Sequence, residues 1–161
     1  MRLLRLILAI FMMVGLVVIP ATSANAVTRY VYVEDHTGSK WPVTVAEPWV
    51  DYYTGSVMVY GKCRSGYKCI RVYEKTIRSD WAAVTRSTTT GFVIYINPQR
   101  AWWSYTRRLN LIKHELVHAM GYYTHWAYCN DLMYWHTNCP NGSLLLTSYI
   151  HSPIRDVLRR N

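Results

Sequence analysis

The sequence has no internal repeat, no low-complexity tract and no stretch with the composition of an interdomain linker. Nothing therefore divides the chain, and a single layered domain is expected. It also contains no C-x-x-C pair, which argues against a four-cysteine zinc site. No calcium-loop signature is present.

Long hydrophobic runs are absent except near the N-terminus, where the run is somewhat short for a bilayer span of about 20 residues. Arg2 and Arg5 precede this run and Ala24-Asn25-Ala26 follows it, a pattern typical of a secretory signal peptide. A transmembrane anchor is the alternative. We expect residues 1–26 to be removed and residues 27–161 to be a secreted, extracellular domain without a membrane anchor.

Acidic residues are few, at 9 against 18 basic ones, so the net charge is +9. Loss of Arg2 and Arg5 with the signal peptide lowers it to +7. In a secreted protein this excess favours anionic cell-surface polymers or acidic substrates over nucleic acid, although it also serves solubility. We expect a monomer that does not bind nucleic acid.

The four cysteines all lie in the expected exported part, where oxidising conditions favour two disulfides. Three pairings are possible. The sequence-local pairing is favoured because each bond then closes a short, turn-rich segment. That pairing joins Cys63 to Cys69 and Cys129 to Cys139.

Hydrophobic periodicity predicts an α+β fold built on a twisted mixed sheet of about four strands. Alternating patterns predict the strands at 29–34, 56–61, 69–74 and 91–97. Helical spacing of apolar residues predicts the helices at 42–53, 100–122 and 149–160. Pro48 is expected to kink or shorten the first of these helices.

The segment His114-Glu115-Leu116-Val117-His118 lies in the predicted helix 100–122. Histidines four residues apart lie on one helical face, one turn apart, within reach of a single metal ion. Glu115 is adjacent to the first histidine and can accept a proton from a water molecule that zinc activates. The pattern therefore predicts Zn²⁺ as cofactor and metal-assisted amide hydrolysis, with Glu115 as general base.

Two features follow this motif. Gly121 can adopt the positive φ that ends a helix and turns the chain back toward the metal, and His125 follows in the expected loop as a third ligand. Farther on, Met133 can form an apolar floor beneath the ligands if it lies in a tight turn. Burial in the core is the commoner role of a methionine.

Together, HELVHAMGYYTH and DLMY resemble the metzincin clan of zinc peptidases, with its HExxHxxGxxH signature and Met-turn. They are most similar to small, secreted, matrixin-like bacterial members. The resemblance implies a zinc metalloendopeptidase acting on protein or peptide substrates, with a metzincin-like fold that has an active-site helix, a Met-turn and a C-terminal helix. It also implies that strand 91–97 is the edge strand lining the substrate cleft.

One departure from the clan's spacing concerns the third histidine. The clan places it six residues after the second, where this chain has Thr124, whereas His125 comes seven residues after His118. A loop tolerates an extra residue because helical hydrogen bonds no longer hold it. Asp131 and His136 are the replacements to test if His125 is not a ligand. The expected zinc ligands are His114, His118 and His125.

Two other functions remain open. The chain has 14 tyrosines and 7 tryptophans, which suit a zinc-containing module that binds cell-wall material. A peptidoglycan amidase on the same scaffold would use the same chemistry. Glu115 argues against a pure binding module, because a structural zinc site needs no carboxylate beside a ligand. Substrate preference depends on the loop around residues 135–146 and is not predicted.

Overall fold

The computed structural model describes residues 30–54, 56–78, 80–125 and 132–133, and for residues 51–54 it describes the backbone alone. Several predictions lie outside these residues. They are the signal peptide 1–26, the Cys129–Cys139 disulfide, the replacement ligands Asp131 and His136, the loop 135–146 and the helix 149–160.

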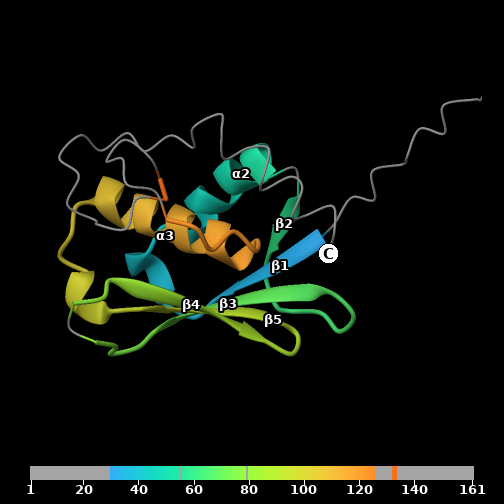
Figure 1. The fold of residues 1–161 in the computed structure, drawn as a ribbon, viewed down its shortest axis with the longest axis horizontal. Coiled ribbons are helices and arrows are strands. Elements are labelled where there is room, and N and C mark those ends of the chain that lie inside the picture. The colour runs from blue at the N-terminus through green and yellow to red at the C-terminus, as the bar shows by residue number, and fades with distance from the viewer. Residues whose placement is uncertain (1–29, 55, 79, 126–131, 134–161) are drawn as a thin grey trace, which may run out of the picture.

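A five-stranded mixed sheet forms one layer of the described part (Figure 1). Its strand order is β2-β1-β3-β5-β4, with all neighbours parallel except β4 and β5, which are antiparallel. The strands are β1 Tyr30–Asp35, β2 Val57–Tyr60, β3 Lys68–Glu74, β4 Ala83–Thr88 and β5 Gly91–Ile96.

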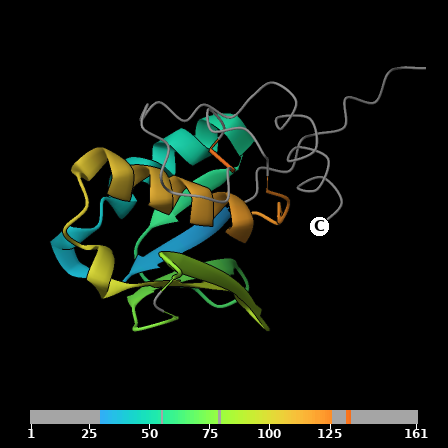
Figure 2. The same ribbon diagram turned by 60° about the vertical axis from the view of Figure 1, so that its left-hand side comes forward.

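Two helices, α2 (Val43–Thr54) and α3 (Tyr105–Ala119), pack against each other over one face of this sheet (Figures 1 and 2). In β5 the alternate residues Phe92, Ile94 and Ile96 are buried toward the helices, whereas Val93 and Tyr95 are half-buried on the other face. This period of two is what a sheet covered on one side requires. The hydrophobic core therefore lies between the sheet and the two helices.

The sheet has one more strand than the four predicted, because β4 was not recognised. Its core-facing positions include the half-buried Ala83 and Thr85 instead of large apolar residues, so its alternation is weak. The expectation that strand 91–97 forms the edge is also wrong. β5 lies between β3 and β4, and β4, like β2, lies at an edge of the sheet that the described residues form.

The helix predicted at 100–122 is shorter than expected. A 3-10 helix, η3 (Pro98–Arg100), follows Asn97, whose side chain accepts a hydrogen bond from the Gln99 amide at 3.1 Å. The chain then turns, and Ser104 caps α3 by accepting from the Arg107 amide at 3.4 Å. The predicted helix 42–53 agrees with α2, which continues through Pro48.

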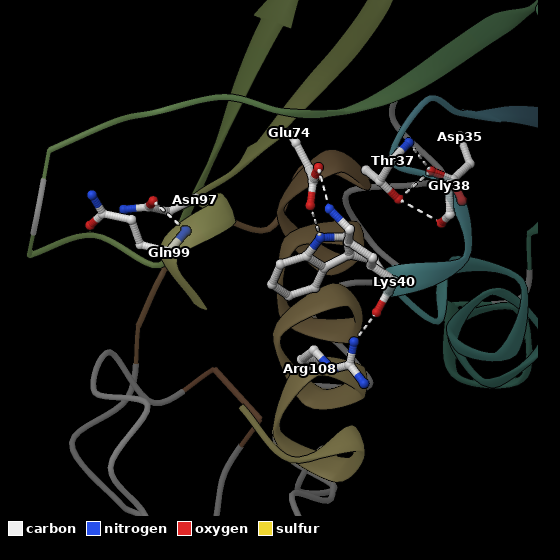
Figure 3. A network of polar contacts seen from close by, with 9 residues as sticks. Asp35, Thr37, Gly38, Lys40, Glu74, Asn97, Gln99 and Arg108 are labelled. Carbon is white, nitrogen blue, oxygen red and sulfur yellow. Dashed lines mark hydrogen bonds and ion pairs between the residues drawn. The ribbon is translucent and has the colours of Figure 1, made fainter. Parts of the chain in front are cut away.

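Polar contacts join the start of α2 to β3 and α3 (Figure 3). The Glu74 carboxylate accepts a hydrogen bond from Trp41 Nε1 at 2.9 Å and pairs with Lys40 Nζ at 3.7 Å. Lys40 lies in the 3-10 helix η2 (Gly38–Lys40), and its carbonyl accepts a hydrogen bond from Arg108 on α3. These contacts fix the N-terminal half of α3 against the sheet.

The predicted Cys63–Cys69 disulfide is present, with the two Cα atoms 5.6 Å apart. It closes the loop between β2 and β3. Among the residues that the structure describes, no helix is both long and apolar enough to cross a membrane.

Candidate metal and catalytic site

The last two turns of α3 carry His114, Glu115 and His118. The two histidine rings lie on one face of the helix, with ring centroids 4.5 Å apart. Glu115 and His118 are only 4% and 7% exposed. The helix therefore presents two imidazoles and one carboxylate in a largely desolvated environment.

Gly121 ends the helix and returns the chain to this face. Its φ of 99° is a conformation that favours glycine, as the sequence predicted. The Gly121 amide donates to the His118 carbonyl at 2.9 Å, and the Tyr122 amide donates to the Val117 carbonyl at 3.3 Å. This hydrogen-bond pair is a Schellman motif. The reversal that it produces brings His125 back to the helix.

The three histidine side chains meet through their Nε2 atoms. The Nε2 atom of His118 lies 2.9 Å from that of His114 and 3.1 Å from that of His125. The Nε2 atoms of His114 and His125 are 3.2 Å apart. Three nitrogens bound to a tetrahedral zinc at about 2.0–2.1 Å lie about 3.3 Å from one another. The donor set therefore fits one zinc ion, despite the extra residue before His125.

In His114 and His118 the second ring nitrogen, Nδ1, contacts a backbone carbonyl. His114 Nδ1 lies 2.7 Å from the Leu132 carbonyl oxygen, and His118 Nδ1 lies 2.7 Å from that of Tyr122. A neutral ring that donates from Nδ1 leaves the Nε2 lone pair for a metal. Both contacts thus select the tautomer that a metal ligand needs.

Burial keeps these imidazoles neutral. It lowers the pKa of His114 to about 4, and the nearby His125 acts in the same direction. Burial, followed by the neighbouring His114, also lowers the pKa of His118 to about 4. The pKa of His125 is lowered by burial as well. Neutral imidazole is the form that binds metal, so the histidines are ready to bind at neutral pH.

Burial has the opposite effect on Glu115, because it raises the pKa of a carboxyl group. The neighbouring His118 and a hydrogen bond from Thr85 act against this rise. The Thr85 hydroxyl donates to Glu115 Oε2 at 2.6 Å. Thr85 was missed in the sequence because β4 was missed. Its only signal was the alternation in residues 83–88.

Leu132 and Met133 are almost completely buried, at 1% and 0% exposure. Through its carbonyl, Leu132 contacts the His114 ring, so this short segment lies beside the histidines. A second cluster of possible metal donors, Glu34 with Cys63 and Cys69, is not a metal site because both cysteines form the disulfide.

No protein-family model and no curated protein sequence matches the chain. Among solved structures, the chain is similar to archaemetzincin from Methanopyrus kandleri, with a TM-score of 0.58 and 13% sequence identity. The alignment covers 86% of this chain and 99% of that one. The likeness shows a shared fold, which agrees with the metzincin resemblance of the sequence.

Proposed function

We propose that this protein is a secreted zinc-dependent endopeptidase in which His114, His118 and His125 hold the metal and Glu115 is the general base. The observation that carries the proposal is the convergence of three Nε2 atoms within 3.2 Å of one another beside a buried carboxylate. Catalytic zinc sites use three protein ligands and keep one position open, whereas structural sites use four. The fold shared with archaemetzincin supports the same reading.

When bound, zinc supplies a Lewis acid for the scissile carbonyl and makes the attacking water more acidic. Glu115 accepts the proton of that water and later donates it to the leaving amine. The burial that raises its pKa helps the carboxyl group hold the proton between the two steps. Leu132 and Tyr122 keep two of the histidine rings oriented.

Secretion is the part of the proposal that rests on the sequence, through Arg2, Arg5, the apolar run and Ala24-Asn25-Ala26. The assignment to matrixin-like bacterial members rests likewise on HELVHAMGYYTH and DLMY. Protein or peptide is the proposed substrate class, because the chemistry is that of amide hydrolysis.

The test is hydrolysis of casein and of a quenched peptide library by the purified, zinc-loaded protein. We expect Glu115→Gln to keep bound zinc and to lose hydrolysis by about 10²–10⁴-fold, the usual contribution of a general base. Glu47→Gln, which changes a buried carboxylate on α2, is the matched control and should stay active.

Full activity of the Glu115→Gln variant would contradict the mechanism. A parallel assay on purified cell wall separates the alternatives. Release of cell-wall fragments without cleavage of casein would indicate an amidase. Binding of the protein to cell wall, with hydrolysis of neither cell wall nor casein, would indicate a binding module.

A further inference from the structure

Thr85 lies on the edge strand β4, opposite Ile94 of β5, and its side chain points toward α3. Its hydroxyl oxygen is 2.6 Å from Glu115 Oε2 and 3.2 Å from the Glu115 backbone carbonyl oxygen. A hydroxyl group has one proton, and 2.6 Å is the length of a bond from a hydroxyl to a carboxylate. The proton is therefore donated to Oε2.

The hydrogen bond from Thr85 is made to the carboxylate of Glu115. Among the residues that the structure describes, no second side chain donates a hydrogen bond to its carboxylate. Oε2 therefore already accepts a hydrogen bond from Thr85, whereas Oε1 accepts none from a side chain that the structure describes. Because β4 and α3 are in contact along this stretch, the hydroxyl ties the edge of the sheet to the helix that carries the histidines.

Packing alone would not require threonine at this position. Valine has nearly the same shape and a higher tendency to form strands, and it would fill the same space beside Ile94. What threonine adds is a donor aimed at a buried carboxylate, and a buried carboxylate that lacks donors is costly. The hydroxyl therefore has a role that the strand does not need.

We propose that Thr85 is a positioning residue whose hydroxyl holds the Glu115 carboxylate in one orientation, with Oε2 toward β4 and Oε1 available for proton transfer. Its catalytic consequence rests on the proposed function, whereas the hydrogen bond itself does not. Loss of the hydroxyl lets the carboxylate rotate, which lowers the rate of proton transfer and leaves substrate binding unchanged.

The chain offers a well-matched set of variants. Thr85→Val removes the hydroxyl and keeps the shape, whereas Thr85→Ser keeps the hydroxyl. Thr88→Val makes the same chemical change on the same strand, at an exposed position that faces away from α3. Thr85→Ala replaces the valine variant if that variant fails to fold. Zinc content should be equal in all of them, which separates positioning from metal binding.

The first readout is independent of turnover. The chain has only four glutamates, so carbon-13 labelling of their carboxyl carbons gives four NMR signals from the zinc-loaded protein. The Glu115 signal is identified by its disappearance in Glu115→Gln. We expect Thr85→Val to move this signal, and Thr85→Ser and Thr88→Val to leave it near its wild-type position.

The second readout is steady-state peptide hydrolysis. We expect Thr85→Val to lower kcat by about 10- to 100-fold, the cost of a misplaced catalytic group, with KM unchanged. Thr85→Ser should restore most of kcat. A wild-type kcat in Thr85→Val, or an unmoved Glu115 signal, would overturn the inference. If the wild-type protein hydrolyses nothing, the proposed function fails, and the NMR comparison still decides whether Thr85 holds the carboxylate.

Discussion

The Nδ1 atom of His114 lies 2.7 Å from the carbonyl oxygen of Leu132, eighteen residues farther along the chain. Leu132 and the adjacent Met133 are almost completely buried, and buried side chains in a close-packed interior have little freedom to move. The carbonyl that orients a proposed zinc ligand therefore lies next to a fully buried methionine.

Met133→Ala should therefore affect both stability and zinc binding. We expect it to lower the free energy of unfolding by about 2–5 kcal/mol, the usual cost of truncating a buried methionine. Zinc affinity should fall by about 10- to 100-fold, because an outer partner of a ligand is displaced. Urea unfolding and competition with a zinc indicator measure the two effects. Met58→Ala, on β2 and 5% exposed, is the control that should lose stability and keep its zinc affinity.

Gly121→Ala should weaken the metal site through the backbone. A side chain at a φ of 99° strains the turn by about 1–2 kcal/mol. The strain disturbs the position of the Tyr122 carbonyl and the return of His125, so we expect weaker zinc binding by competition titration. Gly66→Ala also has a positive φ, 83°, with no atom within 4 Å of the new Cβ. Equal zinc affinities in the two variants would contradict this account.

Removal of zinc should abolish hydrolysis and lower the melting temperature. Metal that binds only the folded state stabilises it by about 4 kcal/mol when free zinc is 1,000 times its dissociation constant. Differential scanning calorimetry before and after chelation measures the shift, and added zinc should restore it. In His118→Asn the melting temperature should not respond to zinc. A zinc-dependent shift of wild-type size in that variant would place the metal elsewhere.

The metal-free protein should lose stability as the pH falls from about 6.5 toward about 4. The unfolded state takes up protons on its histidines near pH 6.5. The folded state holds His114 and His118 neutral down to about pH 4, so it binds fewer protons in this range. Stability is then lost on acidification, and the contribution is fully present above pH 6.5. Urea midpoints at several pH values measure it, and a double substitution, His114→Gln with His118→Gln, should flatten the dependence.

Strands that bury one face could be predicted from the sequence. In β1, β3 and β5 the residues of the main hydrophobic core recur at every second position, and the predicted limits of these strands agree with the structure within one or two residues. β4 could not be predicted in this way, because an edge strand contacts the core over less of its surface and its core-facing Thr85 serves a carboxylate instead. The local Cys63–Cys69 bond could be predicted, because it depends only on a short loop.

In the candidate site too, the residues set by local geometry could be predicted, and those set by the tertiary fold could not. The spacing of His114, Glu115 and His118 follows from helix geometry alone, and Gly121 follows from the way helices end. The Thr85–Glu115 bond joins residues thirty positions apart, so no local pattern contains it. The position of His125 depends on the whole path of a loop, and the clan's spacing indicated a neighbouring residue instead.

The most direct test of the central claim is an anomalous scattering map, collected at the zinc absorption edge from crystals of the zinc-loaded protein. We predict one strong peak at about 2.0–2.1 Å from the Nε2 atoms of His114, His118 and His125. A map without a peak at these three nitrogens would contradict the account, as would a peak ligated by Asp131 or His136 in place of His125.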